Sequence, residues 1–161
     1  MNYRLKKVAV LGSGVMGSGI ACHLANVGME VMMLDIVTPN LHKTQSNDKV
    51  HRNKLVNTAL QKTIKSKPAP LYHKSLASKI QTGNFEDDFE KIDEADWIIE
   101  VVVENLKIKK QIFENVDQYR KKGSLVSSNT SSIPINLLAE GCSDDFKACF
   151  CGTHFLILLD I

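Results

Sequence analysis

The chain has 161 residues, of which 43% are hydrophobic and 24% are charged, and its formal net charge is +2. These values are typical of one globular domain with a single core. The small, scattered charge argues against a nucleic-acid-binding surface, and no apolar run approaches the roughly 20 residues of a membrane-spanning helix. The N-terminus also lacks a signal-peptide pattern. We therefore expect a cytoplasmic protein without nucleic-acid or membrane partners, whose four cysteines stay reduced.

Strand and helix patterns alternate along the chain. Short β-branched or apolar runs predict six strands, at residues 7–11, 30–34, 78–82, 96–103, 124–128 and 148–154. Apolar residues at helical spacing predict helices at residues 15–27, 50–64, 106–121 and 134–139. Gly83 and Asn84 are predicted to form a turn after the third strand. Because parallel neighbours need helical crossovers, this order predicts an α/β fold, a doubly wound parallel sheet in one domain over residues 1–161.

A glycine-rich segment follows the first predicted strand and opens the first predicted helix. Gly12, Gly14 and Gly17 form the pattern G-x-G-x-x-G in the context that a dinucleotide-binding loop requires. Gly12 permits a tight turn, Gly14 lets the backbone approach a pyrophosphate, and Gly17 lets the helix pack closely on the strand. The backbone amides of Val15 and Met16 are predicted to point at the phosphates.

An aspartate completes this pattern. Asp35 ends the second predicted strand, 23 positions after Gly12, close to the roughly 20-residue spacing of dinucleotide-binding folds. A carboxylate there accepts both ribose hydroxyls of NAD and repels the 2′-phosphate of NADP, and residues 36–40 contain no Arg or Lys to reverse that preference. The sequence therefore predicts NAD as cofactor. Two alternatives to an NAD site are open. The loop could bind a flavin instead, or it could be a glycine turn beside an unrelated surface aspartate.

Three stretches carry a resemblance to a known family. They read KVAVLGSGVMGSGIA from Lys7, EVVVENLKIK from Glu100, and SSNTSS from Ser127. Together they resemble the N-terminal NAD-binding domain of the 3-hydroxyacyl-CoA dehydrogenases, and most closely the multifunctional bacterial fatty-acid oxidation proteins that carry an enoyl-CoA hydratase domain later. The resemblance runs from Tyr3 to Phe155.

The resemblance implies roles for four further residues. Glu104 and Lys109 match the pair that contacts the nicotinamide-side ribose, Asn129 matches a cofactor-binding position, and Ser131 matches the serine that touches substrate and nicotinamide. Each has a plainer explanation by itself. Residues 129–132 could be a self-capped turn before a short helix, Glu104 could favour a helix N-terminus, and Lys109 could lie on a solvated face.

The Gly-x-His-Phe segment at the sixth predicted strand matches the position of the family's general base. His154 is thus expected to take the hydroxyl proton of the substrate, although a histidine satisfied at a strand end is the plainer alternative. The family continues with Phe-Asn-Pro and, further on, a glutamate that orients the histidine. This sequence continues with the apolar residues 156–159, a shortened segment in which Asp160 is the one candidate for that glutamate.

Cys149, Cys151 and His154 come nearest to a metal-binding pattern. They lack a paired C-x-x-C spacing, and the two cysteines stand two apart in an apolar run. Buried core thiols explain this better, so the sequence predicts no metal centre.

By resemblance, the chain is expected to belong to an enzyme that oxidises (S)-3-hydroxyacyl-CoA to 3-oxoacyl-CoA with NAD. The family's helical C-terminal domain has no counterpart in the sequence, so the chain alone is expected to be inactive. It is also expected to self-associate, through its exposed apolar C-terminal strand or through the surface that the missing domain would cover. Two alternatives stay open: a non-catalytic NAD-binding remnant or fragment, and another NAD-dependent 3-hydroxy acid dehydrogenase.

Overall fold

A computed structural model of the chain describes residues 5–156. Within them one parallel sheet is formed by β1 (Lys7–Leu11), β2 (Glu30–Asp35), β3 (Ile80–Asn84), β4 (Trp97–Glu100), β5 (Leu125–Ser128) and β6 (Phe150–Gly152). The strand order is β3-β2-β1-β4-β5-β6. The order reverses between β1 and β4, and open α/β sheets bind ligands at the carboxyl ends of the strands beside such a reversal. The predicted fold class is confirmed.

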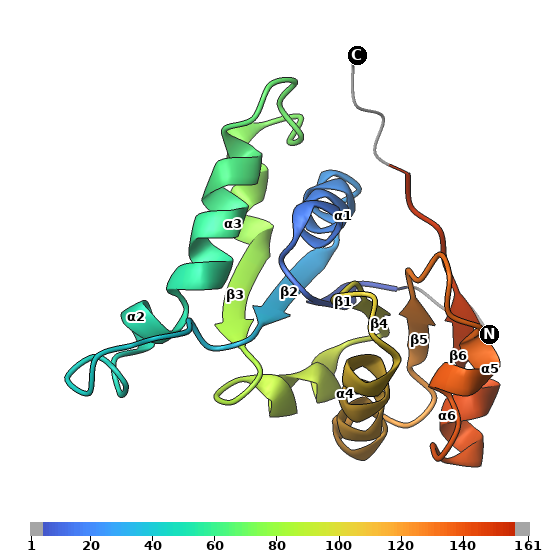
Figure 1. Cartoon of the computed structure of the whole chain (residues 1–161). Coiled ribbons are helices and arrows are strands. Elements are labelled where there is room, and N and C mark those ends of the chain that lie inside the picture. The colour runs from blue at the N-terminus through green and yellow to red at the C-terminus, as the bar shows by residue number, and fades with distance from the viewer. Residues whose placement is uncertain (1–4, 157–161) are drawn as a thin grey trace.

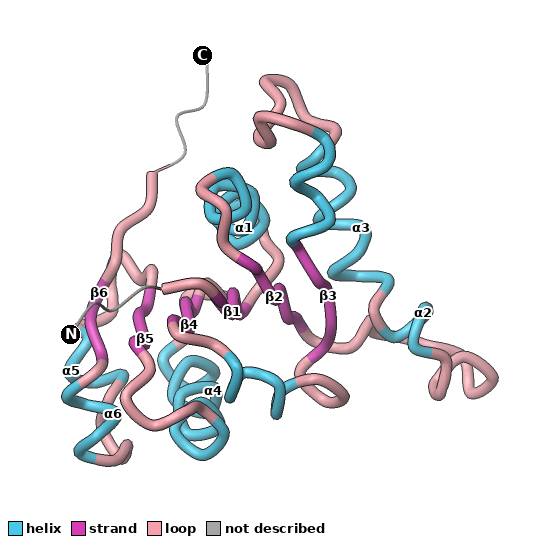
Figure 2. The backbone as a smooth tube through the Cα atoms, turned by 180° about the vertical axis from the view of Figure 1, so that it is seen from behind, coloured by secondary structure: helices cyan, strands magenta, loops and turns pink. Residues whose placement is uncertain are grey.

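Helices cover both faces of the sheet. They are α1 (Val15–Asn26), α2 (Lys49–Arg52), α3 (Lys54–Ile64), α4 (Leu106–Tyr119), α5 (Ile135–Leu138) and α6 (Asp144–Ala148), with 3₁₀ turns η1 (Lys74–Lys79) and η2 (Phe89–Glu94). Figures 1 and 2 show α1 and α3 on one face and α4, α5 and α6 on the other. None of these helices is long and apolar enough to cross a bilayer.

Each face has its own apolar core. On the α1 and α3 face, alternate strand residues such as Val8 and Val10 pack against helix residues such as Ile20 and Val56. On the other face Phe113 is fully buried, with ring centroids 5.7 Å from Phe146 and 5.0 Å from Phe150. Burial of both sheet faces explains why the strands read as continuous apolar runs rather than as alternating patterns.

Several predicted boundaries were wrong. Gly83 and Asn84 are the last two residues of β3, paired with Leu34 and Asp35, and do not form a turn. The chain turns one residue later because the buried Asn84 side chain accepts hydrogen bonds from the backbone amides of Glu86 and Asp87. The first residue predicted for the third strand, Ser78, lies in η1.

The fourth and sixth strands are shorter than predicted, ending at Glu100 and Gly152, and Ala148 belongs to α6. The cysteine prediction needs a related correction. Cys149 and Cys151 are half-buried rather than enclosed in the core, because β6 is the edge strand of the sheet.

The helix predicted over residues 50–64 is two helices that meet at Asn53. The Asn53 side chain is buried and accepts a hydrogen bond from Asn84 Nδ2 at 2.7 Å, which fixes the junction to the end of β3. A separate cap starts α2, where Asp48 accepts from the amide of Val50 at 2.9 Å. Apolar periodicity did not predict this break because polar contacts distant in sequence cause it.

Candidate functional site

The glycine loop joins β1 to α1, and each of its three glycines occupies its position for a different geometric reason. Gly12 has φ +112°, and a Cβ there would lie 2.8 Å from Val101 O. A Cβ on Gly17 would lie 1.9 Å from Gly12 O, so the helix can approach the strand only with glycine. A Cβ on Gly14 would meet nothing within 4 Å. Gly14 therefore borders open space, as a site for close approach of a ligand to the backbone requires.

The start of α1 leaves backbone donors free. Gly14 is its N-cap and supplies no capping side chain, and among residues 5–156 no acceptor pairs with the amides of Val15 and Met16. The first turn closes at Ser18, whose amide donates to Gly14 O at 2.9 Å. Unpaired amides at a helix N-terminus, together with the helix dipole, favour an anionic group such as a phosphate.

Asp35 binds the glycine loop. Its Oδ2 accepts hydrogen bonds from Ser13 N at 2.7 Å and Ser13 Oγ at 2.6 Å, and its Oδ1 accepts from the amide of Ile36 at 2.7 Å. Ser13 is buried, and its own carbonyl accepts from Ser18 Oγ at 2.8 Å. The carboxylate at the end of β2 therefore fixes the loop after β1.

One cavity of about 820 Å³ joins the loop to Asp35. Its volume lies within the 300–1,000 Å³ common for small-molecule sites. Its polar wall contains residues 12–16 and Asp35. Gly17 does not line it, because it is buried where α1 packs against the loop. Apolar side chains including Phe85, Phe89 and Ile108 form much of the remaining wall. The sequence-predicted residues of the loop and Asp35 are thus brought together around one space.

A second cluster lies at the carboxyl ends of β4 and β5, outside the lining of that cavity. Lys109 is fully buried, with its Nζ 2.7 Å from Glu100 Oε1 and 3.1 Å from Glu104 Oε2. Glu100 is also fully buried and accepts from Val102 N and from Ser128 Oγ. The suggestion that Lys109 lies on a solvated face was therefore wrong, since it turns toward two carboxylates. Removing either partner would leave a buried charge less compensated.

Glu104 holds the turn after β5. Its Oε1 accepts from Thr130 Oγ1, from the amides of Ser131 and Ser132, and from Ser132 Oγ at 2.9 Å. The turn also caps itself, since Thr130 Oγ1 accepts from the amide of Ile133. Partial burial raises the pKa of Glu104, but hydrogen bonds from Thr130 and Ser132 and the Lys109 charge outweigh it and lower the pKa to about 2. Glu104 does not cap α4, which begins after Asn105.

His154 lies at the same edge of the sheet, beyond β6, and its side chain is exposed. Asn129 ties this segment to the turn after β5, because its Oδ1 accepts from the amide of Phe155 at 2.8 Å. Within residues 5–156 no carboxylate hydrogen-bonds to the His154 ring. Asp160, the candidate partner, lies outside the described residues. Nor do three or more His, Cys, Asp or Glu side chains gather as metal ligands in this part of the chain.

Sequence reasoning missed two residues of this arrangement. Ser13, the variable residue between the first two glycines, is the one that Asp35 binds. Glu100 preceded the matched pair by only a few positions but looked like part of an apolar strand. A charged residue in an otherwise apolar run was the available signal, because buried carboxylates occur almost only where they are paired.

Comparison with known proteins places the chain in a family. The family model described as "3-hydroxyacyl-CoA dehydrogenase, NAD binding domain" matches residues 7–157. The chain belongs to this family. The resemblance recognised in its motifs is thereby confirmed.

Three relatives of this dehydrogenase domain illustrate the match. The chain is 57% identical to a probable 3-hydroxyacyl-CoA dehydrogenase of Bacillus subtilis, over 96% of the chain and 20% of that protein. It is 41% identical, with the same coverages, to a Rickettsia felis protein whose name describes a fatty acid oxidation complex trifunctional enzyme. A solved (S)-3-hydroxybutyryl-CoA dehydrogenase from Ralstonia eutropha superposes with TM-score 0.68 at 27% identity, over 95% of this chain and 50% of that one. The chain thus spans about a fifth of the two curated relatives.

Substitution of Gly14 separates ligand contact from folding in this dehydrogenase domain. Gly14→Val places a side chain in open space, so we expect the thermal midpoint to change little, while NADH affinity falls by at least about tenfold because the side chain occupies the pyrophosphate position. Calorimetric titration and circular dichroism measure the two effects. As a control, Gly17→Ala clashes with Gly12 O and should lower both stability and affinity. A folded Gly14→Val variant with undiminished affinity would refute this assignment of the loop.

The lowered pKa of Glu104 predicts a pH dependence of stability. Because the folded-state pKa lies below the ordinary value of 4.5, the stability that Glu104 contributes is present above pH 4.5 and is lost as the pH falls toward 2. The difference in unfolding free energy between wild type and Glu104→Gln should therefore be largest at neutral pH and shrink in acid. Urea unfolding followed by Trp97 fluorescence at several pH values measures it. A pH-independent difference for Glu104→Gln would contradict the account.

Proposed function

We propose that this domain binds NAD(H) and supplies the dinucleotide half of an enzyme that oxidises (S)-3-hydroxyacyl-CoA to 3-oxoacyl-CoA. One observation carries the proposal: the unpaired amides of Val15 and Met16 and the Asp35 carboxylate border the same 820 Å³ cavity. A dinucleotide has an anionic centre and, next to it, a ribose diol, and these two features match the two polar walls. The apolar wall beside Phe85 and Phe89 suits a planar base.

In this proposal each part of the cavity has one task. The amides of residues 14–16 bind the pyrophosphate, and Asp35 accepts the hydroxyls of the adenosine ribose. The Asp35 oxygens already accept three hydrogen bonds, from Ser13 N, Ser13 Oγ and Ile36 N. Of the roughly four acceptor sites of a carboxylate, one on Oδ1 therefore remains for a ribose hydroxyl, and a second ribose hydroxyl replaces the Ser13 hydroxyl. NAD⁺, when bound, accepts the hydride from the substrate carbon.

The residues that follow β4, β5 and β6 contact the nicotinamide end of the cofactor and the substrate. The Glu104 side chain is 37% exposed, so Glu104 is the member of the pair that accepts a hydrogen bond from a hydroxyl of the nicotinamide-side ribose. The enclosed Lys109 acts by holding Glu104 in place. Ser131 is exposed on the turn that Glu104 holds and donates to the substrate oxygen. His154 takes the hydroxyl proton. Asn129 positions the His154 segment by accepting from the amide of Phe155, and its side-chain NH₂ group serves the cofactor.

A cytoplasmic setting belongs to the same proposal, because the four cysteines are free thiols. So does self-association of the isolated chain. Val103, Ile135 and Leu156 expose 64%, 42% and 77% of their surfaces near the proposed reacting end. Exposed apolar groups of this kind favour contact with another protein surface.

Asp35 is expected to make the domain prefer NAD(H) over NADP(H). Loss of its charged hydrogen bonds should cost about 1.5–3 kcal/mol, or about tenfold to a hundredfold in NADH affinity. Titration of NADH and NADPH into wild type and Asp35→Ala tests this. Because Asp35 also binds Ser13, the Ser13→Ala variant is the control: it loses the 2.6 Å hydroxyl contact but keeps the carboxylate and should retain the preference. Wild type that binds NADPH as tightly as NADH would overturn the prediction.

The 161-residue chain on its own is expected to oxidise 3-hydroxybutyryl-CoA negligibly even when it binds NAD⁺. His154 has an exposed ring, and no carboxylate within residues 5–156 orients it. Loss of the comparable acid in a serine protease costs about 10⁴-fold in rate. NADH formation is measured for this chain and for a version extended with the remaining residues of the Bacillus subtilis relative, of which the chain covers 20%. Equal turnover by both would contradict the prediction, and activity in neither would favour a purely NAD-binding module.

A further inference from the structure

The ribose end of the cavity has a second carboxylate besides Asp35. Glu86 lies in the turn after β3 and lines the same cavity. The two residues are close because β2 and β3 are neighbours, and the amide of Phe85 donates to Asp35 O at 2.8 Å. The Glu86 side chain is 68% exposed, so its charge is accessible to solvent. Two acidic groups therefore border the position proposed for the adenosine ribose.

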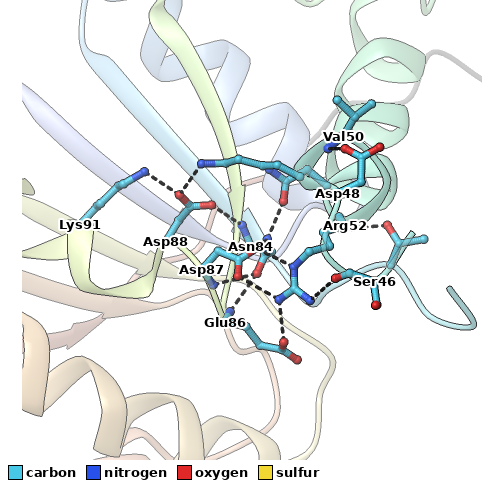
Figure 3. Close-up of polar contacts among 12 residues, drawn as sticks. Ser46, Asp48, Val50, Arg52, Asn84, Glu86, Asp87, Asp88 and Lys91 are labelled. Atoms are coloured by element: carbon cyan, nitrogen blue, oxygen red, sulfur yellow. Dashed lines mark hydrogen bonds and ion pairs between the residues drawn. The ribbon is translucent and has the colours of Figure 1, made fainter. Parts of the chain in front are cut away.

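An arginine is bound to this second carboxylate. The carbonyl of Arg52, at the end of α2, accepts from Thr38 N and Thr38 Oγ1, both at 2.9 Å, which places Arg52 beside the chain that leaves β2. Its Nη2 lies 2.7 Å from Glu86 Oε2 and its Nε lies 2.7 Å from Asp87 Oδ2. Nη2 also donates to Asp87 Oδ1, and Nη1 donates to Ser46 O (Figure 3). Four of the five N–H donors of the guanidinium are thus engaged.

The other cations of this cluster are also paired. Lys49 Nζ lies 3.2 Å from Asp88 Oδ1. Lys91 Nζ lies 2.5 Å from the same oxygen (Figure 3). The group formed by Arg52, Glu86 and Asp87 carries one positive and two negative charges. Its sum is therefore −1, and Glu86 is the member of the group that lines the proposed cofactor cavity.

Dinucleotide folds that accept NADP place an arginine near the end of the second strand to neutralise the 2′-phosphate. Here the arginine in that region has its charge and donors taken by Glu86 and Asp87. We propose that Glu86 is a second specificity-determining residue, which excludes the 2′-phosphate of NADP by its own charge and by holding Arg52. This inference rests on the proposed function, because it concerns the same cofactor site.

A purely structural role makes a different prediction. The ion pairs of Arg52 with Glu86 and Asp87 could serve only to hold the segment after β2 against the turn after β3. In that case, weakening them would lower the affinity for NADH and NADPH equally. A specificity role predicts a selective gain for NADPH while NADH binding stays unchanged. The ratio of the two dissociation constants separates the roles.

The experiment measures NADH and NADPH dissociation constants for wild type and Glu86→Gln at low and high salt. We expect the NADH constant to stay within about twofold and NADPH to bind about three- to tenfold more tightly, most clearly at low salt where charges are least screened. Glu94→Gln is the matched control. Glu94 is 58% exposed and forms a 2.7 Å ion pair with Lys7, at the amino end of β1 and away from the cavity. Loss of the Glu94 charge should therefore leave the ratio of the NADH and NADPH dissociation constants unchanged.

Glu86→Ala removes the same charge by a different side chain and must show the same selective gain. An unchanged ratio in both variants, or a parallel loss of both cofactors, overturns the inference while the proposed function stands. Wild type that binds neither cofactor would overturn both.

Discussion

The contact between Asp35 and Ser13 is the constraint on which the rest of the site depends. It joins the ends of the neighbouring strands β1 and β2 and so fixes the loop whose amides border the cavity. The loop can take this shape only because Gly12 adopts φ +112° and Gly17 lies against Gly12 O. Backbone geometry therefore creates the proposed anion site, and the acid that contacts it also borders the position proposed for the ribose. One carboxylate thus has a structural and a proposed binding task.

A buried network places the second half of the site beside the first. Glu100 at the end of β4 binds Lys109 of α4 and Ser128 of β5, and Lys109 in turn holds Glu104. A lysine shared by two carboxylates is tolerable in the core because each charge has a partner and further hydrogen bonds. The result is a turn at residues 130–132 in which Glu104 fixes the backbone of the exposed Ser131. The proposed reacting groups are carried by loops, but a buried ion cluster sets where those loops lie.

Much of this was predictable from sequence because it depends on local patterns. Apolar runs predicted the strands, and Gly12, Gly14, Gly17 and Asp35 have the spacing that close backbone approach demands. The break at Asn53 was not predictable, because it depends on a side chain distant in sequence. The extension of β3 through Asn84 was not predictable either, because it depends on pairing with the distant strand β2. The same holds for residues brought beside the site by the fold, such as Glu86. Periodicity contains no information about such long-range polar pairs.

The central claim is that the amides of the glycine loop bind the pyrophosphate of NAD(H). Amide chemical shifts of the ¹⁵N-labelled chain, followed by NMR during titration with NAD⁺, test it most directly. The account predicts that the largest saturable shifts belong to Gly14, Val15 and Met16, whose amides border the cavity. Saturable shifts confined to other residues, or no change at the loop when the cofactor is in excess, would contradict it.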